Sequence, residues 1–111
     1  MADANASNFD GIALLGGATV STLTGNLTLT TASQNFQKID PNGARDVVLP
    51  AEASSNGMWF TITNVAGGAE DISVKDDGGA TIVTISQNEQ ATVICDGTSW
   101  VHMGIITIAA S

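Results

Sequence analysis

The sequence has 111 residues, a length that favours one domain with a single hydrophobic core. Eleven acidic residues stand against only three basic ones, and the resulting net charge of −8 argues against binding to nucleic acid or to an anionic membrane. Only 13% of the residues are charged, so the surface must be covered by Thr, Ser, Asn, Gln and Gly, which favours β-structure over helices.

Short runs rich in Val, Ile, Thr and aromatic residues predict strands along most of the chain. In chain order these runs are 19–23, 26–31, 35–39, 46–49, 58–65, 71–75, 81–85, 90–95 and 100–106. The first four are the weaker candidates, and we expect about eight short strands in all. The only predicted helical turn is 50–55, where Pro50 suits the first helical position.

Alternation within the runs predicts which side chains face the core. In 58–65, Phe60 and Ile62 lie on one face and Trp59 and Thr61 on the other. In 81–85 and 90–95 both faces carry apolar residues, which is typical of strands that are covered on both sides. We expect Trp59 and Trp100 to anchor the two sheets of the core or to lie in an interface, with stacking on a sugar ring as the alternative.

Turn signals separate the runs at intervals of roughly ten residues, a spacing typical of sandwiches and barrels. The segments 25–26, 40–43, 54–57, 66–68, 76–79, 87–88 and 96–97 each carry Gly, Asn or Asp. Strands do not alternate with helices. The predicted fold is therefore all-β, an antiparallel β-sandwich of the jelly-roll kind ahead of an immunoglobulin-like arrangement.

The two ends of the chain differ from the middle. We predict an N-terminal arm at residues 1–16, followed by the sandwich domain at 17–111. Apolar residues in the end segments either form the first and last strands of the core or dock on another chain. The candidate interface residues are Phe9, Ile12, Leu14, Leu15, Ile105, Ile106 and Ile108.

Residues that carry chemistry are scarce. His102 is the only histidine and Cys95 the only cysteine, too few for a structural zinc site or an evident catalytic grouping. Cys95 is expected to be a small buried hydrophobe. Asp76 and Asp77 lie in a Gly-rich turn, where solvated carboxylates and a bound ion both remain open. We therefore expect a protein that is not an enzyme and that holds no cofactor.

The segments DVVLP at 46–50, GMWFTITN at 57–64 and CDGTSW at 95–100 resemble small structural proteins of tailed phages. The likeness is to the capsid decoration, or staple, proteins of short-tailed phages of the epsilon15 kind. It implies a jelly-roll protein on the outer surface of the virion, bound to the major capsid protein and paired as a homodimer. Such a protein has no active site and holds neighbouring capsid subunits together against the pressure of packaged DNA.

The N-terminus lacks the basic start of a signal peptide, and no apolar run approaches a membrane span, so we expect synthesis in the host cytoplasm. The alternative function is that of a tail-fibre or spike-associated domain that binds a host surface carbohydrate. That alternative predicts a fibrous trimer with an exposed Trp59 or Trp100 beside acidic or amide side chains. The staple function predicts that both tryptophans are buried and that the apolar termini are buried against another protein.

Overall fold

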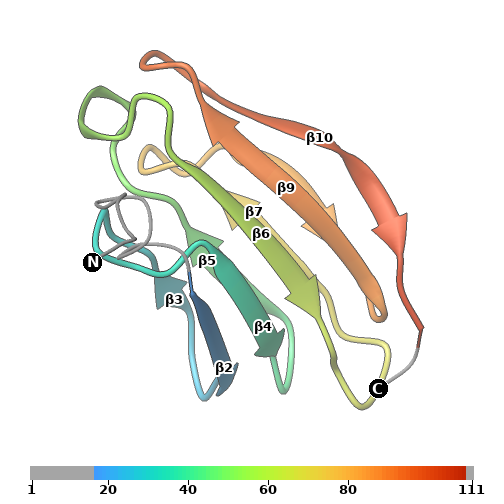
Figure 1. Cartoon of the computed structure of the whole chain (residues 1–111). Coiled ribbons are helices and arrows are strands. Elements are labelled where there is room, and N and C mark those ends of the chain that lie inside the picture. The colour runs from blue at the N-terminus through green and yellow to red at the C-terminus, as the bar shows by residue number, and fades with distance from the viewer. Residues whose placement is uncertain (1–16, 110–111) are drawn as a thin grey trace, which may run out of the picture.

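The computed structural model describes residues 17–109, which form two facing β-sheets (Figure 1). The five-stranded sheet has the order β10–β9–β6–β4–β2 and consists of β2 (Ala18–Thr22), β4 (Phe36–Asp40), β6 (Trp59–Asn64), β9 (Glu89–Cys95) and β10 (Trp100–Thr107). The four-stranded sheet has the order β3–β5–β7–β8 and consists of β3 (Leu27–Thr28), β5 (Arg45–Val48), β7 (Ile72–Lys75) and β8 (Thr81–Ile85).

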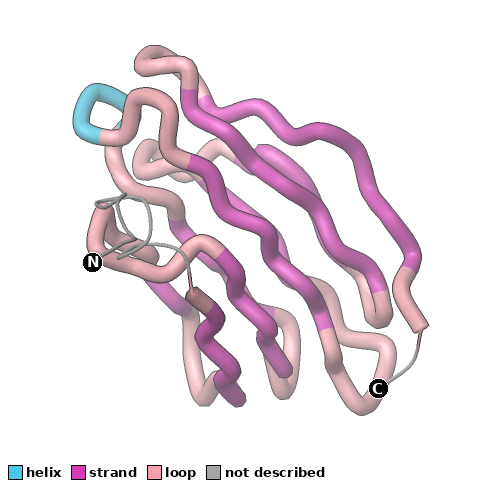
Figure 2. Tube along the Cα trace, in the orientation of Figure 1, coloured by secondary structure: helices cyan, strands magenta, loops and turns pink. Residues whose placement is uncertain are grey.

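Helical structure in residues 17–109 is limited to one 3₁₀ turn, η1 (Glu52–Ser54), as Figure 2 shows. This turn falls within the predicted helical segment 50–55. None of the helical structure in this part of the chain is long and apolar enough to cross a membrane.

The chain changes sheet after each strand from β2 to β6, and this winding makes most of the strand pairs parallel. β2 pairs with β4 and β4 with β6 in one sheet, while β3 pairs with β5 and β5 with β7 in the other. The pairs β7–β8, β6–β9 and β9–β10 are antiparallel. The all-β prediction is thus confirmed, but the sheets are mixed, and the predicted antiparallel jelly roll is corrected to three stacked windings followed by antiparallel strands.

A parallel pair needs a long crossover connection, which is usually a helix. Here the crossover between two strands of one sheet is a strand of the opposite sheet, as β3 is between β2 and β4. Between β2 and β7, two of the connections from sheet to sheet, 23–26 and 41–44, are as short as hairpin loops, whereas the others are longer. The turn signals marked many of the strand ends but not the turn between β3 and β4, and they did not show which strands pair.

The core fills the space between the sheets. Phe60 and Ile62 of β6 are fully buried in one cluster with Ile72 and Val74 of β7. Trp100 is also buried, and its ring centroid lies 5.9 Å from that of Phe60. The alternation predicted for 58–65 is confirmed, and one of the two tryptophans anchors the core as expected.

Candidate interaction surface

Large apolar side chains that remain exposed gather on the five-stranded sheet. They are Val20, Trp59, Ile94, Val101, Met103, Ile105 and Ile106, which belong to β2, β6, β9 and β10. Single exposed apolar residues are ordinary, but a group on one sheet indicates an interaction site.

Three of these side chains are aligned across neighbouring strands. Trp59 pairs with Ile94, and Ile94 pairs with Val101. The next residues along β6 and β9, Phe60 and Val93, are buried in the core, so the three aligned side chains point away from it. We call Trp59, Ile94 and Val101 the apolar row. Trp59 is 43% exposed, which corrects the expectation that both tryptophans anchor the core.

The edge strand β10 extends the apolar row (Figure 1). Only its first residue, Trp100, is buried, and the next seven are exposed. The strand contains no charged residue and no proline, two of the features by which sheet edges avoid pairing with other chains. A bulge between His102 and Ile105 is a third such feature and is present, so regular pairing is open only on either side of it. β10 can therefore accept contacts along its edge as well as on its faces.

Charge lies mainly outside this surface. On the four-stranded sheet, Lys75 Nζ of β7 lies 3.1 Å from Asp46 Oδ2 of β5. Several acidic residues sit in turns, such as Asp76 between β7 and β8 and Asp96 between β9 and β10. The apolar row and β10 are thus an uncharged region on a molecule with a net charge of −8.

The predicted interface residues fall into two groups. Ile105 and Ile106 are exposed in β10, and Ile108 follows it, half-buried, with its backbone N donating to Asn88 O at 2.8 Å. Phe9, Ile12, Leu14 and Leu15, with the rest of the predicted arm at 1–16, lie outside the described residues.

Sequence reasoning missed Ile94, Val101 and Met103, and it singled out Trp59 without including it among the candidate interface residues. The apolar residues on both faces of 90–95 predicted a strand covered on both sides, whereas Ile94 on the outer face is exposed. The same signal could instead have indicated a partner surface.

The residues that could take part in catalysis or bind a metal do not lie together in residues 17–109. Cys95 is buried, its thiol donating to Glu52 O at 3.5 Å, whereas His102 is exposed. Asp76 Oδ1 accepts hydrogen bonds from Gly78 N at 3.0 Å and Ala80 N at 2.8 Å, which accounts for its place in the turn. In this part of the chain, no three His, Cys, Asp or Glu residues cluster closely enough to hold a metal ion.

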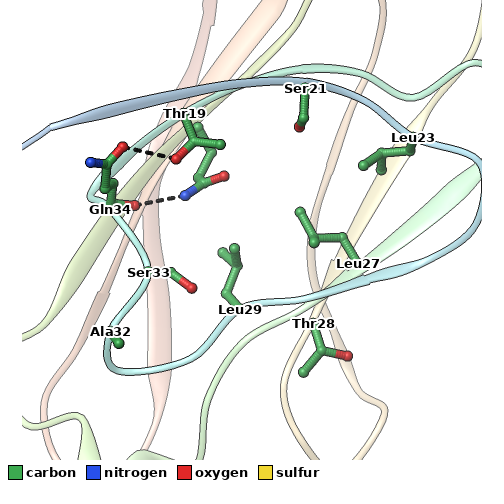
Figure 3. Close-up of a pocket in the computed structure, with 10 residues that line it drawn as sticks. Thr19, Ser21, Leu23, Leu27, Thr28, Leu29, Ala32, Ser33 and Gln34 are labelled. Atoms are coloured by element: carbon green, nitrogen blue, oxygen red, sulfur yellow. Dashed lines mark hydrogen bonds between the residues drawn. The ribbon is translucent and has the colours of Figure 1, made fainter.

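A cavity of about 300 Å³ opens between β2 and β3, at the end of the stacked windings (Figure 3). Leu23, Leu27 and Leu29 form its apolar lining, and Thr19 Oγ1 donates to Gln34 Oε1 at 2.9 Å at its rim. The cavity lies on the β2–β3 side of the sheets, at the end opposite β10.

Comparison of the chain with protein-family models, curated protein sequences and solved structures finds no significant match.

Proposed function

We propose that this protein is a non-catalytic binding protein that decorates the outer surface of a phage capsid and staples neighbouring major capsid subunits. The observation that carries the proposal is the uncharged surface formed by the apolar row and the exposed residues of β10. The resemblance of the segments 46–50, 57–64 and 95–100 to staple proteins supports the capsid as the partner.

The composition of this surface suits contact with a protein. The centres of protein interfaces are poor in charge and rich in aromatic residues and Met, as the combination of Trp59 and Met103 provides. The free edge of β10 adds backbone donors and acceptors for a strand of the partner. Two copies related by a twofold axis would hold two capsid subunits, and the second contact gains from being intramolecular.

Co-sedimentation with undecorated phage heads tests the proposal. The wild-type chain should pellet with the heads, and because the surface is uncharged, binding should persist when the salt concentration is raised. Heads that leave the wild-type chain in the supernatant would overturn the capsid role.

A matched pair of substitutions tests the surface itself. Ile106→Glu places a charge in the contact and should weaken binding at least about tenfold. Thr84→Glu adds the same charge at an exposed site on β8 in the other sheet and should bind as the wild type does. Equal binding by the two variants would show that docking uses a different surface.

Carbohydrate binding is the second candidate function, and the exposure of Trp59 favours it. However, on the β9 side the aligned neighbours of Trp59 are Ile94 and, beyond it, Val101. The nearby amide of Asn35 is buried and already donates to Trp59 O at 2.7 Å, so it is not presented to a sugar. Host polysaccharide that protects Trp59 from quenching by acrylamide, and loses this effect in Trp59→Phe, would favour the carbohydrate function over docking on a capsid.

A further inference from the structure

The end of the core between β2 and β3 is incomplete within residues 17–109. β2 is the outermost strand of one sheet beside β4, and β3 is the outermost strand of the other beside β5. Between them lies the cavity of about 300 Å³. The cavity is open to solvent, but its wall is formed by leucines that belong to the core or pack against it, so it offers an apolar seat for a further occupant.

Ser21 has a hydroxyl group at this cavity that needs a hydrogen-bond partner. Its side chain lines the cavity (Figure 3), and its buried Oγ has no hydrogen-bond partner in the part of the chain that the structure describes. Buried hydroxyl groups are nearly always paired. The occupant should therefore bring backbone or side-chain polar groups as well as apolar bulk.

The step of the winding indicates which residues fit. Each residue of β2 pairs with the residue 18 positions later in β4, from Ala18 with Phe36 to Thr22 with Asp40. The offset is 20 for β3–β5, 25 for β4–β6 and 27 for β5–β7, so it shortens toward the N-terminus. The shortest described offset, 18, taken backwards from β3 places Phe9 opposite Leu27 and Asp10 opposite Thr28. Leu27 lines the cavity and packs against the core, and Thr28 is exposed, so this register puts the phenyl ring inside and the carboxylate outside.

A corner residue repeats at the same step. Asn26 lies just before β3, and its Oδ1 accepts a hydrogen bond from Asp46 N of the next winding at 2.9 Å. Asn8 stands 18 positions before Asn26 and just before Phe9. It offers the equivalent acceptor to the backbone of Asn26.

We propose that residues 8–11 of the same chain form a strand parallel to β3 along its free edge and place Phe9 in the cavity. The chain between this strand and β2 is long enough to reach. Asp10 lies eight positions before the start of β2, and Thr28 at the end of β3 likewise lies eight positions before the start of β4. The proposal concerns the fold and does not depend on the capsid role. It assigns Phe9 to the protein's own core rather than to a partner.

A disulfide trap in the full-length chain tests the register. In a Cys95→Ala background, Asp10→Cys is combined with Thr28→Cys, because adjacent strands bring such residues within the separation that a disulfide spans. Mild oxidation of the dilute protein should give an intramolecular bond, seen as loss of both free thiols without a dimer on a non-reducing gel.

The control combines Asp10→Cys with Thr84→Cys, an exposed site on β8 at the opposite edge of the same sheet. It should form at least about tenfold less intramolecular disulfide in the same time. Equal yields from the two pairs would overturn the proposal. So would a disulfide that the first pair forms only between different molecules, since the occupant of the cavity would then come from a second copy.

A second measurement does not require a new bond. Phe9→Ala should lower the urea midpoint of unfolding by about 1 M, and Phe9→Leu should recover most of the loss, because the cavity needs apolar volume rather than an aromatic ring. A Phe9→Ala chain with the wild-type midpoint would show that Phe9 does not fill the cavity.

Discussion

Asn64 joins the two sheets through its side chain. It is fully buried at the end of β6, where its Nδ2 donates to Glu70 O at 2.8 Å and to Ile85 O at 2.9 Å. Its Oδ1 accepts from Ala66 N at 2.9 Å. All three partners are backbone groups, which only an amide side chain with both donors and an acceptor can satisfy together.

Replacing Asn64 by Ala leaves those three buried backbone groups without partners. We expect Asn64→Ala to lower the free energy of unfolding by about 3 kcal/mol, as measured by urea denaturation. The control is Asn56→Ala in the exposed turn before β6, which should change stability by less than about 0.5 kcal/mol. A similar loss for both variants would mean that Asn64 contributes no more than a surface asparagine does.

Asp96 makes stability depend on pH at the turn between β9 and β10. Hydrogen bonds from Ser99 N at 2.8 Å and Thr98 N at 2.9 Å to its Oδ1 favour the charged form and hold the pKa of its carboxyl below the ordinary value. A carboxyl whose pKa is lower in the folded state stabilises the protein above its unfolded-state pKa, and this stabilisation is lost as the pH falls through the folded-state pKa.

The lowered pKa of Asp96 predicts how stability changes when the pH is lowered. Between pH 5.5 and 2.5 the urea midpoint should fall, beginning near pH 4, and Asp96→Asn should make the fall shallower because the amide does not titrate. Asp77→Asn, in the exposed turn between β7 and β8, is the control and should leave the slope closer to that of the wild type. An Asp96→Asn slope as steep as the wild-type slope would contradict the assignment.

At the scale of the element, the strands could be located from the sequence but their pairing could not. Alternation placed Phe60 and Ile62 inside, because a buried face imposes its period on the residues. Pairing depends on where each turn directs the chain, and the turn at Asp40–Gly43 has the composition of a hairpin yet leads to the opposite sheet. There Arg45 fixes the path by donating from Nε to Pro41 O and from Nη2 to Asn42 O, both at 2.9 Å.

Only part of the candidate surface could be predicted from the sequence, because hydrophobicity does not show which faces of a sheet are covered. Hydrophobicity singled out Ile105 and Ile106, which are exposed in β10. Nothing local distinguishes a covered outer face from an open one, so Ile94 was assigned to a covered strand. Whether a second layer covers a sheet is decided by the fold as a whole.

Gly104 gives β10 its bulge. Its φ is +99°, in the left-handed region, and a Cβ added there would meet no atom within 4 Å. The cost of Gly104→Ala is therefore conformational, and we expect a loss of about 1–2 kcal/mol in urea unfolding. Gly25 also has open space around it but no left-handed φ, so Gly25→Ala should not destabilise the protein. A neutral Gly104→Ala would show that the edge strand relaxes without the bulge.

For the whole molecule, the winding implies that stability is unevenly distributed. In a stack, each unit is held mainly by its neighbours, and end units have fewer of them. β6 lies between β4 and β9, whereas β2 and β3 are the edge strands at one end of the described sheets and flank the cavity. The β2–β3 end should open locally without unfolding the rest.

Native-state hydrogen exchange measures this gradient. The amides of Leu23, bonded to Asp40 O at 2.9 Å, and Leu29, bonded to Val48 O at 2.8 Å, report on the end of the stack. They should exchange through openings that need roughly 2 kcal/mol less free energy than those of Phe60 and Ile62 in the middle. Small additions of urea should leave the end openings nearly unchanged and accelerate exchange in β6, because only global unfolding exposes much surface. Equal free energies and equal urea dependence at all four amides would mean that the two sheets unfold as one unit, and the account of a stack with a weak end would then be wrong.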